Sequence, residues 1–209
     1  YQYAEKVLTD YPEKQFNIIC CDVENFKLVN ERFGMEKGDE LLCYLADKYQ
    51  ELLGNSGFCA RINADIFAML IEVNEENQLE ALYNAFQREK LFSAPVPNLV
   101  VKWGVYEIVD RTVPVSRMCD RAILAIKKIK HQYKQNVVWY DDTLRLEMLK
   151  EQQVLDNMEA ALEEKQFKIY LQPKYDVQTN KIVGAEALVR WIHPEKGMIS
   201  PGEFIPLFE

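Results

Sequence analysis

The chain has 209 residues, 48% of them apolar, which allows one full domain and part of a second with a sizeable core. Charged residues of both signs make up 28% of the chain, which excludes a low-complexity or disordered class. The formal net charge of −8 argues against binding to nucleic acid polymers or anionic membranes. A nucleotide ligand stays open if a bound cation or locally placed Lys and Arg residues balance its phosphates.

The cysteines indicate reduced core residues in a cytoplasmic protein. Their number is odd, and no two form a Cys-x-x-Cys pair. Each lies in an apolar segment: Cys20, Cys21, Cys43, Cys59 and Cys119. A zinc site is not expected, because His131 and His193 lack ligand spacing.

No apolar run is long enough to span a bilayer, and there is no signal peptide. The chain does not begin with Met, so we expect an excerpt, with any sensor or membrane segment outside it.

The start of the chain predicts a helix and then a buried strand. Residues 1–14 are polar with scattered Tyr and Val, and the helix is expected to end near Pro12. Residues 16–23 are mostly apolar and predict the strand. If the strand extends that far, the carboxylates of Asp22 and Glu24 leave the same face, because side chains two apart in a strand do so.

Two helices are expected next. Residues 25–33 predict the first, closed by Gly34, and residues from about 39 to 53 predict the second, closed by Gly54. The second helix has an apolar stripe formed by Leu42, Leu45, Tyr49 and Leu52.

Residues 57–73 predict a tight β-hairpin. Two apolar runs flank the polar break Asn63-Ala64-Asp65. The second run is nearly all apolar, which is typical of a central strand. A hairpin tip with a lone Asp is suited to hold a metal or a phosphate; the alternative is a simple turn.

The remaining elements of this part predict one mixed sheet. Helices are expected at 78–90 and 115–130, and strands at 98–109 and 137–140. The resulting order, βααββαβαβ, indicates an α/β (α+β) fold with an antiparallel hairpin and helices packed on the sheet, related to the ferredoxin-like arrangement.

Composition changes at Asp141-Asp142, which predicts a boundary after residue 141. Residues 143–165 contain no Gly or Pro and predict one long helix, so 142–165 is read as a linker and first helix. Residues 166–209 then begin a second domain. Strands are expected at 167–175 and 181–191.

The second of these strands carries an acid and a base on one face. That face holds Gly184, Glu186, Leu188 and Arg190. Charges of both signs are unusual in a strand that otherwise looks buried. The pair is read either as an internal ion pair or as a functional site.

Two stretches resemble known families. Asp22-Val-Glu-Asn-Phe-Lys-Leu-Val-Asn-Glu31, then Gly38-Asp39 and the hairpin, resemble the GGDEF domain of diguanylate cyclases, a nucleotidyl-cyclase-like fold. The pattern in that family is Asp-x-Asp-x-Phe-Lys-x-x-Asn-Asp, Gly-Asp and the Gly-Gly-Asp-Glu-Phe turn. The stretches Leu171-Gln-Pro173, Gly184-Ala-Glu-Ala-Leu-Val-Arg-Trp191 and Ile199-Ser-Pro-Gly-Glu-Phe-Ile-Pro206 resemble the start of the EAL domain of cyclic di-GMP phosphodiesterases.

The first resemblance implies a degenerate catalytic site. Members join two GTP molecules with two divalent cations, Mg²⁺ or Mn²⁺, held by the first strand Asp and the Glu of the turn. Asp22 fills the first role here, as a vestigial metal ligand. The turn reads Asn63-Ala64-Asp65-Ile66-Phe67, so an alkyl side chain stands at the Glu position and the paired glycines are absent. We therefore expect no two-metal catalysis.

Nucleotide binding is still implied. The resemblance assigns guanine recognition to Asn30 and Asp39, and phosphate contacts to Lys27 and Lys127. A carboxylate accepts from two guanine N–H groups and an amide donates to the carbonyl. The alternatives are ordinary solvated charge for the two lysines and a helix N-cap for Asp39. His131 stands where the family has a second phosphate-binding Arg.

The second resemblance implies a metal-assisted phosphodiesterase. Glu186 matches the metal-ligand Glu of the EAL family, and Gln172 and Arg190 match contacts to cyclic di-GMP. The family fold is a (β/α)₈ barrel of roughly 200 or more residues, so residues 166–209 hold only its truncated start. The remaining ligands and the general base lie on later strands. Without them, this segment is expected to pack as an appendage or to pair through exposed strand edges, which leaves a homodimer open.

The reading favoured by both resemblances is the regulatory half of a cyclic di-GMP phosphodiesterase, with GTP as the first partner and cyclic di-GMP as the partner of the full-length protein. One alternative is a non-catalytic cyclic di-GMP or GTP receptor or interaction scaffold. A second is residual diguanylate cyclase activity that uses Asp22, Glu24 and Asp65.

Overall fold

The computed structural model describes residues 1–73, 79–130, 132 and 134–208. The chain forms two compact units, Tyr1–Asp141 and Asp142–Glu209. Among the described residues, no helix combines the length and the apolar character needed to cross a membrane.

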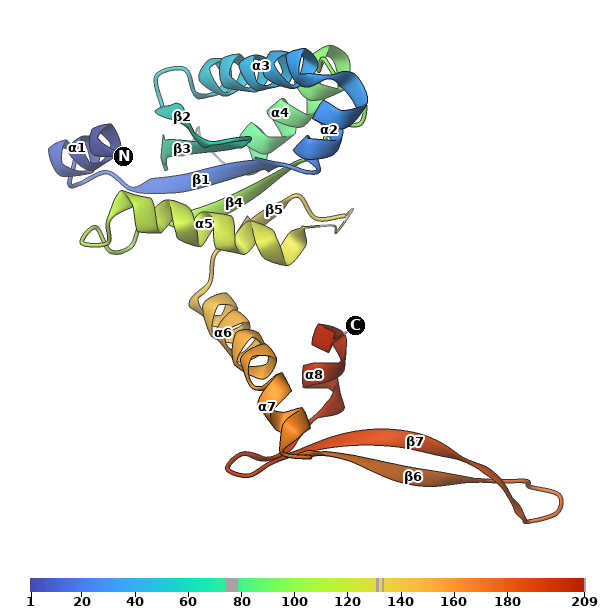
Figure 1. Ribbon diagram of the computed structural model, residues 1–209. Helices are drawn as coiled ribbons and strands as arrows, with labels where there is room; N and C mark the ends of the chain where they lie inside the picture. The colour runs from blue at the N-terminus through green and yellow to red at the C-terminus, as the bar shows by residue number, and fades with distance from the viewer. Residues whose placement is uncertain (74–78, 131, 133, 209) are drawn as a thin grey trace. The chain divides into compact units, whose positions relative to one another are not determined.

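The first unit is built on one five-stranded sheet with the order β2-β3-β1-β4-β5 (Figure 1). Neighbouring strands are antiparallel except β4 and β5, which are parallel. The mixed sheet with an antiparallel hairpin is confirmed, and the strongly apolar strands β3 and β1 lie inside it. The strands are β1 (Phe16–Val23), β2 (Gly57–Asn63), β3 (Ile66–Glu72), β4 (Val101–Glu107) and β5 (Val137–Trp139).

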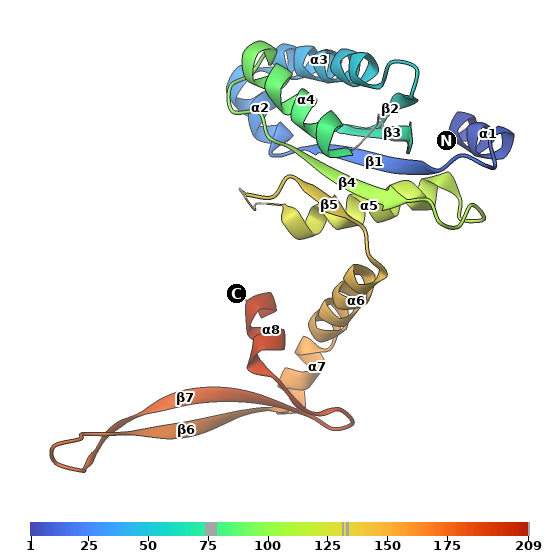
Figure 2. The ribbon, with the colours of Figure 1, turned by 180° about the vertical axis from the view of Figure 1, so that it is seen from behind.

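Helices cover both faces of this sheet. Figures 1 and 2 show α3 and α4 on one face and α5 on the other. Alternate residues of β1 therefore enter two clusters: Ile19 packs with α3, and Ile18 packs with α5. The helices are α1 (Gln2–Asp10), α2 (Phe26–Phe33), α3 (Met35–Leu53), α4 (Leu79–Ser93) and α5 (Val115–Ile129).

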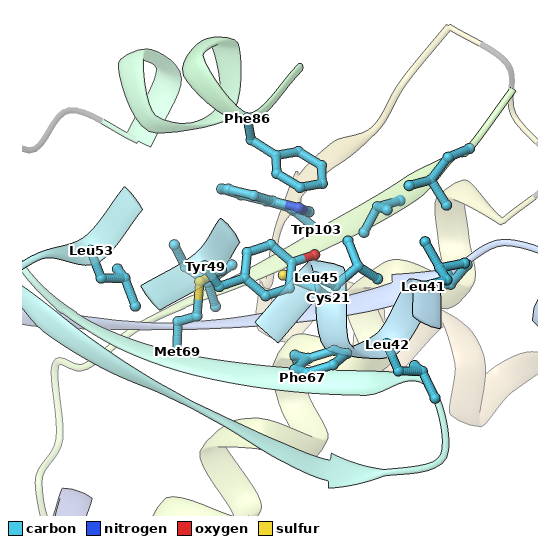
Figure 3. Packing of buried hydrophobic residues seen from close by; sticks show 14 of the residues in the cluster. Cys21, Leu41, Leu42, Leu45, Tyr49, Leu53, Phe67, Met69, Phe86 and Trp103 are labelled. Atoms are coloured by element: carbon cyan, nitrogen blue, oxygen red, sulfur yellow. The ribbon is translucent and has the colours of Figure 1, made fainter. Parts of the chain in front are cut away.

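Tyr49 is the centre of the larger cluster (Figure 3). Its ring centroid lies 5.5 Å from that of Phe67 on β3, 5.4 Å from Phe86 on α4 and 6.2 Å from Trp103 on β4. Each aromatic pair of this kind contributes about 0.5–1.5 kcal/mol beyond the area it buries. One side chain of α3 thus ties the hairpin, α4 and the sheet together.

The starts of α3 and β4 differ most from the predictions. The second helix starts at Met35, directly after Gly34, and not near Asp39. Gly34 has φ 88°, which lets the chain turn sharply between α2 and α3 without a longer loop. Strand β4 begins only at Val101, because Asn98 has φ 54° and cannot extend the strand.

The cysteines are all free thiols, but one lies outside the core. Cys20, Cys21 and Cys119 are buried, as expected, and burial raises the pKa of the Cys21 thiol well above its usual range. Burial also raises the pKa of Cys59 to about 11. Cys43 is exposed on α3, so its assignment to the core is wrong: it falls on the solvent side of the helix.

The second unit is a three-stranded antiparallel sheet with three helices. Its small core consists of Ala161, Trp191 and Phe204, and the ring of Phe167 lies 5.0 Å from that of Trp191. The indole N–H of Trp191 donates to Oε1 of Gln166 at 2.8 Å. The elements are α6 (Asp142–Asp156), α7 (Met158–Glu163), β6 (Phe167–Tyr175), β7 (Ile182–His193), β8 (Gly197–Ile199) and α8 (Pro201–Phe208).

Two predictions for this unit are wrong. The helix expected at 143–165 is divided at Asn157, whose side-chain amide donates to the carbonyl of Gln153 and competes with regular helix geometry. Strand β7, which was expected to be buried, is not buried along most of its length: the exposed fraction of Val183 is 68%. Within the described part of this unit, only the Trp191 end of the hairpin is covered by a core.

Candidate functional site

Asp22 lies at the end of β1, between two strands whose register sets its neighbours. Ile66 of β3 is directly opposite Asp22 on one side, and Lys102 of β4 is directly opposite on the other. Directly opposite residues in antiparallel strands point to the same face. The three side chains are therefore adjacent, on the face covered by α5. Strand β1 ends at Val23, so Glu24 follows the strand, and its N–H bonds to the carbonyl of Val100 at 2.9 Å.

The hairpin turn brings a second carboxylate to this place. Ala64 has φ 36°, and its carbonyl accepts a hydrogen bond from the side chain of Arg61. Asp65 follows and is half-buried. Partial burial raises its pKa, and the negative charge of Asp22 raises it further, whereas Lys130 acts in the opposite direction. Asn63 is exposed. The turn is thus formed as predicted, with Asp65 electrostatically coupled to Asp22.

Two lysines that the sequence analysis missed lie among these carboxylates. The Nζ atom of Lys130, just after α5, is 3.4 Å from both carboxylate oxygens of Asp22. The Nζ atom of Lys102 is 3.6 Å from Oε2 of Glu24, and its side chain is 0% exposed. Lys102 was detectable in principle, because a lysine within the apolar stretch of β4 is unusual. Lys130 was not, because its contact with Asp22 spans 108 residues.

Lys102 is fixed in place by a set of oxygen acceptors. Its ammonium donates to the carbonyl of Gln132 at 2.6 Å, to the carbonyl of Gln135 at 2.8 Å and to Oδ1 of Asn136 at 2.8 Å. A buried charge is tolerated only when it is paired and hydrogen-bonded. Gln132, Gln135 and Asn136, which follow α5 in the chain, therefore surround this ammonium.

The residues expected to recognise guanine lie on adjoining helices. Asn30 is on α2, and its Oδ1 is buried and has no hydrogen-bond partner among the described residues. It lies against Gly38 of α3: a Cβ built on Gly38 would be 1.8 Å from that oxygen. Asp39 is exposed and follows Gly38 inside α3, so the N-cap interpretation of Asp39 is wrong.

The lysines expected to contact phosphate are exposed and lie on two different helices. Lys27 on α2 is 3.8 Å from Glu31, one turn along the same helix, which is an ordinary surface ion pair. Lys127 is in the last turn of α5. His131 lies outside the described residues.

In the second unit, the hairpin brings two of the predicted residues together. Gln172 of β6 is directly opposite Glu186 of β7. The carboxylate of Glu186 is 3.3 Å from Nζ of Lys174, and both side chains are more than half exposed. Arg190 instead donates to the carbonyl of Val189 at 2.8 Å. The acid thus pairs with Lys174 of the neighbouring strand.

Family models divide the chain into two parts. The model of the diguanylate cyclase GGDEF domain matches residues 2–136. The chain belongs to the GGDEF domain family. Behind this GGDEF domain, residues 155–209 match the model of the EAL domain. The chain therefore combines the two domain types of cyclic di-GMP signalling proteins, the EAL domain in part only.

Two relatives of this GGDEF protein are named as enzymes of cyclic di-GMP turnover. The bifunctional diguanylate cyclase/cyclic di-GMP phosphodiesterase MucR of Pseudomonas aeruginosa is 27% identical over 201 residues, which cover 94% of this chain and 29% of MucR. The cyclic di-GMP phosphodiesterase NbdA of the same species is 24% identical over 200 residues, covering 94% of this chain and 26% of NbdA. The chain thus spans less than a third of the length of these relatives.

Solved structures confirm the fold of the first unit. The GGDEF domain of TpbB (or YfiN) from Pseudomonas aeruginosa superimposes with a TM-score of 0.60 at 17% identity, over 71% of this chain and 91% of that chain. At an identity this low, the similarity shows only that the two domains share a fold. The sequence-based assignment of a GGDEF domain followed by the start of an EAL domain is confirmed.

The divalent cations that GGDEF and EAL domains generally use do not fit the first unit. Among the described residues, no group of three or more His, Cys, Asp and Glu side chains is arranged to hold a metal ion. The position opposite Asp22 carries the alkyl side chain of Ile66, which cannot ligate a cation. Lys130 already contacts both oxygens of Asp22.

Proposed function

We propose that the GGDEF unit of this chain is a GTP-binding regulatory module without cyclase turnover, and that the parent protein is a cyclic di-GMP phosphodiesterase. Occupancy of the GGDEF unit would tune hydrolysis through α6 and α7, which connect the two parts along the chain. The EAL residues Glu186, Gln172 and Arg190 would hold the metal and the substrate in the parent.

The observation that carries the loss of turnover is the register at Asp22. Synthesis of cyclic di-GMP requires a ribose 3′-hydroxyl to attack an α-phosphate, with two cations stabilising the attacking and leaving oxygens. Position 66 is directly opposite Asp22, where a second carboxylate would complete a shared metal site. The side chain of Ile66 has no oxygen, so position 66 cannot supply this second carboxylate to the metal.

Retention of binding is supported by the guanine side of the site. Asn30 has a buried carboxamide oxygen for which the described part of the chain offers no hydrogen-bond partner, and the neighbouring Asp39 is exposed and can accept hydrogen bonds. An amide and a carboxylate together match the carbonyl and the two N–H donors of guanine. Lys27 and Lys127 are the proposed phosphate contacts.

Two measurements on the purified chain test this function. Calorimetric titration with GTP is expected to show binding, and incubation with GTP and Mn²⁺ is expected to give no cyclic di-GMP on chromatography. Absence of heat at millimolar GTP would leave the unit a purely structural role or that of a scaffold. Product formation would instead support a residual cyclase that uses Asp22, Glu24 and Asp65.

Gly38→Ala is expected to weaken GTP binding about tenfold while changing the free energy of unfolding by no more than about 1 kcal/mol. The new Cβ would stand 1.8 Å from Oδ1 of Asn30 and must displace that side chain, whereas alanine itself suits a helix interior. Calorimetry and urea unfolding measure the two quantities. Gly202→Ala is the control, because its Cβ would meet only Oγ of Ser200 at 3.8 Å. Unchanged affinity in Gly38→Ala would contradict the guanine role of Asn30.

A further inference from the structure

Two ammonium groups stand among the carboxylates at the end of β1. Nζ of Lys130 is 3.4 Å from each oxygen of Asp22, so it lies symmetrically in front of the carboxylate. Nζ of Lys102 is 3.6 Å from Oε2 of Glu24, and the register puts Lys102 opposite Asp22 as well. Together the two lysines carry the same charge as one divalent cation.

The two lysines differ in how freely they can move. Lys102 is 0% exposed, and its Nζ donates to one oxygen each of Gln132, Gln135 and Asn136. Moving the ammonium would break these hydrogen bonds and its ion pair with Glu24, which is costly. The side chain of Lys130 is 40% exposed, and its ammonium contacts the carboxylate of Asp22. Lys102 is therefore a fixed cation, whereas Lys130 can also contact a ligand.

A divalent ion approaching Asp22 would therefore be opposed twice. It would have to displace Lys130 from both oxygens of Asp22, and it would then stand near the fixed charge of Lys102. In exchange it would gain no ligand from Ile66, directly opposite. Affinity for hard cations depends on the number and charge of the oxygen ligands, and both are reduced here.

We propose that Lys130 and Lys102 are built-in cations that replace the divalent metal of this site, so that the unit excludes Mg²⁺ and Mn²⁺ and takes a metal-free nucleoside triphosphate. The half-exposed ammonium of Lys130 meets the phosphates, and Lys102 keeps Glu24 and Asp22 neutralised beneath it. The nucleotide part of this inference rests on the proposed GTP-binding function. The exclusion of metal does not.

Mn²⁺ binding followed by electron paramagnetic resonance tests the exclusion on the whole chain. Wild type is expected to leave the signal of free Mn²⁺ undiminished. The double variant Ile66→Glu with Lys130→Met restores a carboxylate, removes the ammonium and keeps most of the apolar stem. It is expected to bind Mn²⁺ at least about tenfold more tightly than wild type.

The matched control is Ile66→Glu with Lys128→Met, which makes the same change in net charge on an exposed residue of α5. It should bind Mn²⁺ more weakly than the Lys130 variant. Mn²⁺ binding by wild type that disappears in Asp22→Asn would overturn the proposal. Equal binding by the two double variants would overturn it too, because Lys130 would then exclude nothing.

GTP titration in excess EDTA and in excess Mg²⁺ tests the nucleotide part. Wild type is expected to bind GTP equally in both buffers, within a factor of about two, and Lys130→Met to lose about tenfold in both. Loss of wild-type affinity in EDTA would overturn the metal-free ligand. No GTP binding in either buffer would refute the proposed function, and the Mn²⁺ experiment would still decide whether the lysines exclude metal.

Discussion

Gly104→Val is expected to unfold the first unit or to lower its free energy of unfolding by about 4 kcal/mol or more. Gly104 lies in β4, between Cys20 of β1 and Val138 of β5. A Cβ at this position would stand 1.9 Å from the carbonyl oxygen of Ala122 and 2.8 Å from Cγ1 of Ile126. Because the nearest atom belongs to helix backbone, no side-chain rotation relieves the clash.

The only relief is a shift of α5 as a whole. That helix buries one complete face against the sheet, including Met118, Ala122, Ala125 and Ile126, so a shift opens the cluster that it shares with β1. Core overpacking typically costs 1–3 kcal/mol when side chains can adjust, and more when backbone must move. The whole free energy of unfolding of a domain of this size is only about 5–15 kcal/mol.

Hydrogen exchange measured by mass spectrometry locates the effect. Peptides from β1 and β4 are expected to lose protection in Gly104→Val. Gly184→Val makes the same exchange in a strand where a Cβ meets nothing within 4 Å, and it should leave β1 and β4 protected. Full protection in Gly104→Val would show that α5 does not pack this closely on the sheet.

The spacing of apolar residues predicted the bounds of an element well where that element buries one clear face. The apolar residues of β1 and of α5 predicted both elements within one residue at each end, because nothing in their surroundings overrides the pattern. The start of α3 was missed, because Gly34 allows two helices to meet without a loop and the residues that follow have no distinctive pattern. The apolar residues of β7 predicted a buried strand, but among the described residues most of β7 is exposed or only partly buried.

The candidate site was predictable in its members but not in its electrostatics. The motif placed Asp22 and Ile66 at the two metal-ligand positions, and the register then showed that these positions are direct cross-strand neighbours. The two lysines come from β4 and from the end of α5, far away in sequence. Pairing of β1 with β4 places Lys102 opposite Asp22, and the packing of α5 on the sheet brings Lys130 to the same carboxylate. No local pattern in the sequence encodes the contact of Lys130.

Glu186→Gln in the full-length parent is expected to lower cyclic di-GMP hydrolysis by about a thousandfold or more, under the proposed phosphodiesterase function. Glu186 faces Gln172 across the hairpin and shares its face of β7 with Arg190. A neutral amide keeps the size of the side chain but binds a divalent cation far less well than a carboxylate does. The substrate contacts proposed for Gln172 and Arg190 stay intact, so the KM for cyclic di-GMP should change by less than about tenfold.

Hydrolysis followed by chromatography on the parent protein checks this, with Glu195→Gln as the control. Glu195 is an exposed carboxylate in the turn after β7. Its substitution removes the same charge without changing a residue of the proposed site. Lys174→Met separates the two interpretations of Glu186. If Glu186 serves only its ion pair with Lys174, both variants should lose stability slightly and neither should lose turnover. If Glu186 holds the metal, only Glu186→Gln should abolish hydrolysis, and a parent that hydrolyses cyclic di-GMP at the wild-type rate with Gln at this position would refute the assignment.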